Sequence, residues 1–207
     1  MDLFKTSFQA KKAPPKAGTP KAGTPKAAPP PADPEPGALA AIEKSGGSVR
    51  PLAQNDDRRE VSFYLHGDAV KDADLAPVKN VKKVVYLHLG KTSVTDAGLA
   101  HIKGLTDLTQ LHLEQTKITD AGLVNLKDLK NLTYLNLYGT AVSDTGLAQL
   151  SGLTNLKSLY VWQTKVTDDG IAKLKKALPN VEVVKGWELP PAKPEAKPET
   201  KKEETKK

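Results

Sequence analysis

Two histidines and one glutamate form the group of side chains in this sequence that could bind a metal or exchange protons. His88 and His112 are 24 residues apart, each lies between two leucines, and Glu114 follows the second by two positions. If these segments are adjacent strands, the imidazoles lie roughly 5 Å apart. Such a group could hold a divalent metal or make a protonation-dependent contact. We nevertheless expect both rings to be solvent-exposed, and no motif fixes a third ligand, so we assign no metal and no cofactor.

Catalytic motifs are missing from the sequence. The chain has no cysteine, and it contains no G-x-S-x-G elbow, no G-x-x-x-x-G-K phosphate loop and no H-E-x-x-H metal motif. The Asp, Ser and Thr residues recur at fixed places in a repeat, which gives them a structural explanation. The sequence therefore predicts that the protein is not an enzyme.

The elements that must position the histidines come from a repeat of constant length. Within each block, alternating apolar residues such as Leu111 and Leu113 give way to the helical spacing of Ile118, Leu123 and Leu126, which predicts a strand, a turn and a short helix. One such unit cannot close a core alone, so the units must stack into a solenoid with a parallel sheet on its concave face and helices on its convex face. The blocks that align without a gap are 57–80, 81–104, 105–128, 129–152 and 153–176.

Recurrent residues of the blocks have predicted structural roles. The alternating pairs that point into the core are Phe63/Leu65, Leu87/Leu89, Leu111/Leu113, Leu135/Leu137 and Leu159/Val161. The threonines that should bond the backbone of the turn and of the next coil are Thr92, Thr116, Thr140 and Thr164. The expected N-caps are Thr95, Thr119, Ser143 and Thr167, each followed by an Asp that the helix dipole favours. Close packing between coils explains a glycine in each helix, at Gly98, Gly122, Gly146 and Gly170.

Composition divides the chain into one folded domain and two tails. Residues 1–37 and 188–207 are rich in Lys and Pro, with Ala in the first and Glu in the second, and they lack a sustained apolar pattern, which predicts disorder. The folded domain is then 38–187, with the helix of 38–44 and a strand from Val49 covering one end of the core and the strand of 181–184 covering the other. Part of the formal charge of +7 sits in these tails.

The repeat resembles that of a known family. The pattern L-x-x-L-x-x-L-x-L-x-x-T-x-[IV]-[TS]-D-x-G-L, carried by residues 81–176, is similar to bacterial leucine-rich-repeat proteins and more distantly to F-box/leucine-rich-repeat adaptors. The resemblance implies a right-handed α/β horseshoe and a role in protein recognition. The first block departs from the pattern at Asp68, Lys71 and Asp74.

The predicted binding site is the exposed face of the sheet, where large amphipathic rings gather. Tyr, Trp and Arg most often anchor interfaces, and all five tyrosines of the chain fall on this face. Another interpretation is that cross-strand pairs merely stabilise the sheet, by roughly 0.2–1 kcal/mol each. The candidate binding residues are Tyr64, His66, Tyr86, His88, Gln110, His112, Glu114, Tyr134, Asn136, Tyr138, Tyr160 and Trp162.

The function predicted from this face is non-catalytic binding of an unknown protein or peptide, and the alternative is binding of a glycan or cell-wall polymer at the cell surface or in the periplasm. No strand position of this face carries Arg or Lys, which argues against specific nucleic-acid binding. We expect no membrane span and a monomer. The first ten residues lack the apolar core of a signal peptide, which favours a cytoplasmic protein; an exported protein is the alternative if the true start lies upstream.

Overall fold

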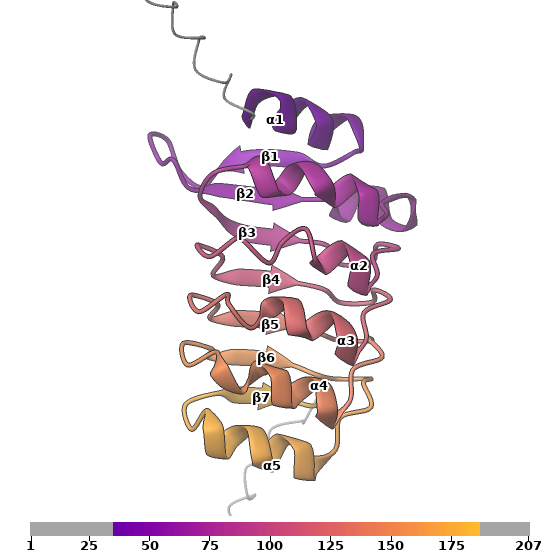
Figure 1. Cartoon of the computed structure of the whole chain (residues 1–207), viewed down its shortest axis with the longest axis vertical. Coiled ribbons are helices and arrows are strands. Elements are labelled where there is room, and N and C mark those ends of the chain that lie inside the picture. The colour runs from indigo at the N-terminus through magenta and orange to yellow at the C-terminus, as the bar shows by residue number, and fades with distance from the viewer. Residues whose placement is uncertain (1–34, 187–207) are drawn as a thin grey trace, which may run out of the picture. The chain divides into compact units, whose positions relative to one another are not determined.

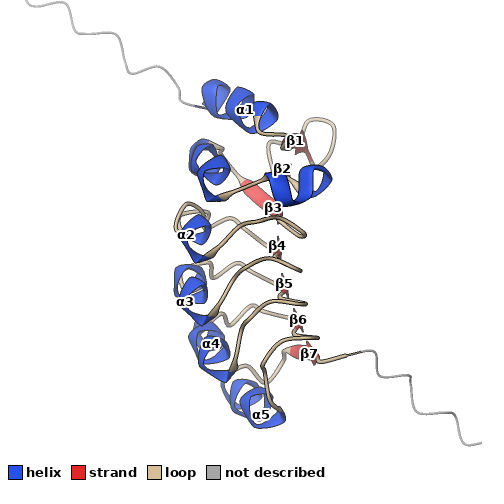
Figure 2. Ribbon diagram, turned by 90° about the vertical axis from the view of Figure 1, so that its right-hand side faces the viewer, coloured by secondary structure: helices blue, strands red, loops and turns tan. Residues whose placement is uncertain are grey.

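The computed structural model describes residues 35–186, which form a stack of coils. Each coil adds one strand to a shared sheet and a helical segment to the opposite side (Figures 1 and 2). Both predicted tails lie outside the described residues, apart from residues 35–37, which belong to the first helix. The helices are α1 (Glu35–Lys44), α2 (Asp96–Leu99), α3 (Asp120–Leu123), α4 (Asp144–Gln149) and α5 (Asp168–Ala177), with 3₁₀ helices η1 (Tyr64–Ala69), η2 (Asp72–Asn80), η3 (Val124–Leu126) and η4 (Leu150–Gly152).

The sheet has seven strands in chain order. The first pair is antiparallel and all later pairs are parallel, as expected when a helical segment connects one strand to the next. From β3 onward the pairing keeps a 24-residue register, in which Leu87 faces Leu111 and Leu111 faces Leu135. The strands are β1 (Ser48–Pro51), β2 (Arg59–Ser62), β3 (Val84–His88), β4 (Gln110–His112), β5 (Tyr134–Asn136), β6 (Ser158–Tyr160) and β7 (Glu182–Val184).

One continuous apolar core fills the space between the sheet and the helices. The predicted inward pairs of the second to fifth blocks are buried, which confirms the strand alternation there. The first block is different, because Leu65 is 83% exposed while Val61 and Phe63 are fully buried. The prediction that Leu65 lies in the core is therefore wrong.

The error at Leu65 comes from two extra residues in the first coil. Val61 pairs with Leu87, a separation of 26 rather than 24 residues, and the register shifts beside Arg59. Farther along, the Val70 carbonyl accepts the Ser93 N–H as the Val94 carbonyl accepts the Lys117 N–H, so the usual spacing of 24 has returned by Val70. The 3₁₀ helix η1 takes up the extra length between strand and turn.

An interaction between coils explains the recurrent Thr-Asp-x-Gly sequence. Asp72 accepts hydrogen bonds from the backbone N–H and the hydroxyl of Thr95 in the next coil, both at 2.7 Å, while the Thr95 hydroxyl accepts from Ala97 N–H at the start of α2. A Cβ on Gly98 would lie only 2.6 Å from the same carboxylate, so a side chain there would displace it. The Asp therefore links coils through hydrogen bonds, beyond its predicted favourable interaction with the helix dipole. The equivalent pairs are Asp96/Thr119, Asp120/Ser143 and Asp144/Thr167.

The buried threonines bond within their own coil. Thr92 Oγ1 donates to the Leu89 carbonyl at 2.7 Å, and Thr116 and Thr140 repeat this contact with Leu113 and Leu137. Each hydroxyl thus satisfies a carbonyl at the turn after the strand. The predicted role in the turn is confirmed, but the expected second bond to the next coil is not among the contacts of these hydroxyls.

Separate elements cover the two ends of the core. Helix α1 packs over the first coil, where Ile42 is fully buried, and β1 extends the sheet beside β2 (Figure 1). At the other end, α5 buries Leu174, and β7 pairs with β6 in the regular register. The structure has a helix or strand at each predicted covering position, with α1 beginning at Glu35 rather than Ala38 and β7 at Glu182 rather than Val181. Within residues 35–186 no helix has the length and apolarity needed to cross a membrane.

Candidate binding face

The outer face of the sheet carries side chains that alternate with the buried leucines, and we call it the sheet face. Backbone pairing sets these side chains side by side, because Tyr86 faces Gln110 and His88 faces His112 in the parallel register. Just beyond the strand ends, Glu114, Tyr138 and Trp162 continue the same alternation. Their carbonyls accept backbone N–H groups of the preceding coil, from Lys91, Gln115 and Gly139 respectively. The sheet face is made of Tyr64, Tyr86, His88, Gln110, His112, Glu114, Tyr134, Asn136, Tyr138, Tyr160 and Trp162.

Ring contacts join the sheet face into a continuous row, which we call the ring row. Tyr64 stacks on His88 with ring centroids 4.9 Å apart, and His88 meets the edge of His112 at 4.4 Å. The row continues from His112 to Tyr134 at 4.8 Å and from Tyr134 to Tyr160 at 5.3 Å. Beside this row, Tyr138 stacks on Trp162 at 5.0 Å. These contacts hold each ring in place, because moving one ring loses contacts with its neighbours.

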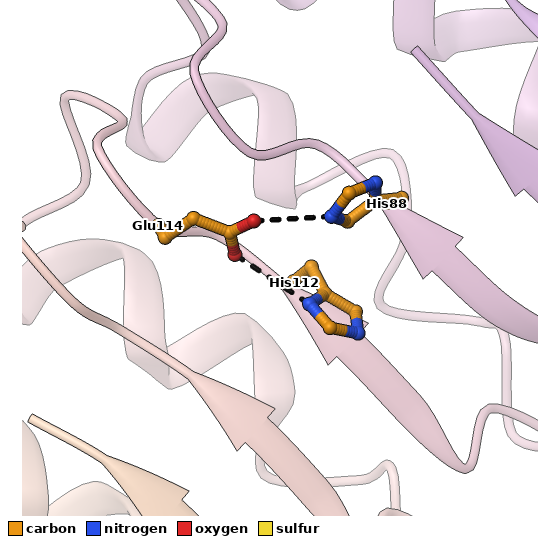
Figure 3. Close-up of side chains that lie close together, drawn as sticks. All are labelled: His88, His112 and Glu114. Carbon is orange, nitrogen blue, oxygen red and sulfur yellow. Dashed lines mark hydrogen bonds and ion pairs between the residues drawn. The ribbon is translucent and has the colours of Figure 1, made fainter. Parts of the chain in front are cut away.

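His88, His112 and Glu114 converge within the sheet face (Figure 3). Oε1 of Glu114 lies 3.0 Å from Nε2 of His88, and Oε2 lies 3.6 Å from Nδ1 of His112. The side chains are 28%, 23% and 13% exposed for His88, His112 and Glu114. The expectation of two solvent-exposed rings is therefore wrong, because each ring is covered by its neighbours in the ring row.

Gly90 makes room for the Glu114 side chain. A Cβ on Gly90 would overlap the Glu114 carboxylate and lie 3.0 Å from Glu114 Cγ. Because Gly90 has no side chain, the Glu114 side chain can lie against its backbone and reach His88. Burial alone would raise the pKa of Glu114, but the neighbouring His112 and His88 imidazoles and its own backbone N–H outweigh burial and lower the pKa to about 2. The carboxylate is thus ionised near neutral pH.

The structure separates one predicted site residue from the others. Tyr64 and His66 were both expected on the strand, and both lie in η1 instead. Tyr64 still stacks on His88, whereas the ring of His66 lies beside Gly46. The place on β2 that matches Tyr86 is instead taken by Glu60, again because of the two extra residues. Sequence reasoning could have found this shift, since Val61 and Phe63 alternate as well as Phe63 and Leu65 do.

Sequence reasoning also missed a lysine beside the ring row. Lys91 donates a hydrogen bond to the Tyr64 hydroxyl at 3.2 Å, and its ammonium lies 5.2 Å from the centre of that ring. Lys91 occupies a turn position with φ of 58°, as Gln115 and Gln163 do with φ of 53°. This conformation is uncommon for residues other than glycine, so the residue types gave no signal of it.

A polar groove lies away from the sheet face, along the loops that lead into the strands. It has a volume of about 580 Å³ and is lined by charged and amide side chains, among them Asp57, Lys83 and Asn131. These groups already have partners: Lys83 pairs with Asp57, and Asn131 donates to the Thr106 carbonyl at 2.9 Å. These lining side chains of the groove are therefore already engaged with other groups of the chain.

Comparisons with known proteins agree with the architecture. A family model described as Leucine Rich repeat matches residues 104–127, which is one full coil of the stack. The neighbouring coils repeat its strand, cap and core positions in the same 24-residue register. The described coils thus share the architecture of leucine-rich repeats, a fold that generally supports protein interaction. No curated protein matches the chain.

Solved structures of bacterial leucine-rich-repeat proteins are similar over about half of the chain. The internalin inlF from Listeria monocytogenes is 25% identical over 53% of this chain and 30% of its own, with a TM-score of 0.47. Internalin C2 of the same species is 28% identical over 53% of this chain and 54% of its own, with a TM-score of 0.41. A leucine-rich-repeat protein of Leptospira interrogans is 22% identical over 52% of this chain and 33% of its own, with a TM-score of 0.39. This chain therefore spans well under two thirds of each of these proteins.

Proposed function

We propose that the protein binds a protein or peptide partner through the sheet face. The observation that carries the proposal is the ring row, in which Tyr64, His88, His112, Tyr134 and Tyr160 follow one another in contact across successive coils. Tyrosine and tryptophan combine a large apolar surface with a polar group, and they are enriched where interfaces gain most of their binding free energy.

The ring contacts also favour binding by limiting its entropic cost. A side chain that is already held by its neighbours loses little rotamer freedom when a partner covers it. The strands from β2 to β6 span roughly 20 Å at ~4.8 Å per strand. A surface of this length suits a peptide, a loop or one face of a small domain, at the lower end of the usual interface size.

The test compares capture of partners by three forms of the full chain. In the first variant, Tyr86, Tyr134 and Tyr160 are replaced together by Ala. In the matched control, Ala replaces Val124, Gln149 and Lys173, which are exposed on the helix side. Partners are captured from lysate of the source cells and quantified by mass spectrometry. We expect a partner retained by the wild type and the control to be lost from the tyrosine variant, with circular dichroism unchanged. Equal capture by all three forms would contradict the proposal.

A second candidate function is binding of a glycan or cell-wall polymer, and the exposed rings at the two ends of the sheet face favour it. Tyr64 and Trp162 are among the exposed large apolar side chains of the described residues, with Trp162 46% exposed. Such rings can stack on the apolar faces of sugars. Pull-down with purified polymers and the same three forms distinguishes this function: retention by polymer, lost in Trp162→Ala, would favour it over a protein partner.

A further inference from the structure

We propose that His88, His112 and Glu114 form a binding site for Zn²⁺ or a similar divalent transition-metal ion. Each residue offers one donor atom, and these atoms all lie within 4.8 Å of one another. In a tetrahedral zinc site, bonds of about 2.0–2.2 Å place neighbouring donors roughly 3.3–3.5 Å apart. The carboxylate lies 3.0 Å from His88 Nε2 through Oε1 and 3.6 Å from His112 Nδ1 through Oε2, so each imidazole nitrogen is near this separation from one of its oxygens.

The donor set has the chemistry that zinc requires. Two imidazole nitrogens and one carboxylate are a common combination in zinc sites that keep an open coordination position. His88 directs Nε2 and His112 directs Nδ1 at the carboxylate (Figure 3). On metal binding each ring would keep its proton on the other nitrogen and give the lone pair of the facing nitrogen to the ion. The carboxylate charge would offset part of the charge of the ion.

An unsatisfied atom points to a missing ligand at this place. Among the described residues, Oε2 of Glu114 is the buried side-chain oxygen or nitrogen atom that has no hydrogen-bond partner. Its contact with His112 Nδ1, at 3.6 Å, is too long for a hydrogen bond. A buried carboxylate oxygen without a hydrogen bond costs free energy, and a bound cation would satisfy it. Gly90 preserves this arrangement, because any larger residue there would occupy the place of the carboxylate.

The backbone positions the donors before a metal arrives. His88 and His112 are paired residues of β3 and β4, and the Glu114 carbonyl accepts the Lys91 N–H at 2.8 Å. The rings are also held by Tyr64 on one side and Tyr134 on the other. Small side-chain rotations therefore suffice to bring the three donor atoms around one ion. This inference does not depend on the proposed function, because the ion can bind without a partner.

The experiment titrates full-length protein, prepared without a histidine tag, with zinc chloride in a calorimeter. We expect one ion per chain, with a Kd of about 10 μM or tighter. His88→Ala, His112→Ala and Glu114→Gln should each weaken binding at least tenfold. Gly90→Ala should also weaken binding although it removes no ligand, since its methyl group displaces the carboxylate. The matched controls His101→Ala and Glu182→Gln, which lie outside the site, should bind as the wild type does.

Two outcomes would overturn the site. One is that wild-type protein binds no zinc at a concentration of about 100 μM. The other is that the three ligand variants bind zinc as tightly as the controls. Circular dichroism of each variant checks that the fold is retained, and absorption of bound Co²⁺ in the visible range provides a second readout of tetrahedral coordination. Loss of zinc binding with unchanged partner capture would separate this inference from the proposed function.

Discussion

Asp120 of one coil accepts two hydrogen bonds from Ser143 of the next: Ser143 N–H donates to Oδ1 at 2.7 Å, and Ser143 Oγ donates to Oδ2 at 2.5 Å. Ser143 in turn accepts a hydrogen bond from Thr145 N–H at the start of α4. The same side chains therefore cap a helix and connect two coils. Because the arrangement recurs along the stack, the Asp contributes to cohesion between coils at every step.

Replacing Asp120 with Ala should lower the free energy of unfolding by about 1.5–3 kcal/mol, the usual value for hydrogen bonds to a charged group. The matched control is Asp128→Ala, because Asp128 is exposed. Urea unfolding followed by circular dichroism measures both. Equal stability of the two variants would contradict the role of Asp120 between coils.

Gly146→Ala should destabilise the protein by about 1–3 kcal/mol, although alanine is the better helix former. The added methyl would fall on the Asp120 carboxylate and 2.9 Å from Val142 Cγ1, and the carboxylate cannot move without losing its bonds to Ser143. Gly104→Ala is the control, because nothing lies within 4 Å of a Cβ there. A more stable Gly146→Ala protein in thermal unfolding would show that helix propensity outweighs the contact between coils.

Leu111→Ala should cost about 2–5 kcal/mol, as expected for a fully buried leucine. Leu65→Ala should change stability by no more than about 0.5 kcal/mol, because this side chain is exposed. Chemical denaturation of the two variants therefore tests the register of the first coil. A large loss of stability in Leu65→Ala would indicate that Leu65 is buried in the core and would contradict the 26-residue spacing.

Asp144 should make stability depend on pH in the acid range. Hydrogen bonds from the Thr167 side chain and backbone lower the pKa of Asp144 below its ordinary value of 3.8. A folded-state pKa below the unfolded one stabilises the protein above the unfolded value, and this contribution disappears as the pH falls through the folded value. The stability difference between wild type and Asp144→Ala should thus be larger at about pH 7 than at about pH 2.5 in urea titrations. A constant difference would show that the Asp144 charge is not involved.

Much of the fold could be predicted from the sequence because the repeat fixes both the spacing and the alternation of core residues. Leu87, Leu111, Leu135 and Leu159 stand in register as a constant 24-residue period requires. The 24-residue period does not hold in the first coil. The alternation in 61–65 is compatible with either Val61 and Phe63 or Phe63 and Leu65 as the inward pair, and pairing with β3 determines which pair is buried.

The site was harder to predict than the fold. The sequence placed His88 beside His112, but the burial of both rings depends on Tyr64 and Tyr134, whose side-chain conformations follow from packing. The position of the Glu114 carboxylate depends on the space above Gly90, which becomes apparent only once the two coils are stacked. The interaction of the recurrent Asp with the helix dipole could be predicted, because it depends on neighbouring residues in the sequence. Its hydrogen bonds to the next coil could not, because they depend on how the coils stack.

Hydroxyl-radical footprinting of the purified complex shows directly whether the partner covers the sheet face. Tyrosine and tryptophan side chains react readily, and Tyr64, Tyr138 and Trp162 of the sheet face are at least partly exposed in the free protein. We expect partner binding to protect these residues while Val124, which is exposed on the helix side, stays reactive. Protection of Val124 with unchanged oxidation of the tyrosines and Trp162 would place the interface on the helix side and rule out binding through the sheet face.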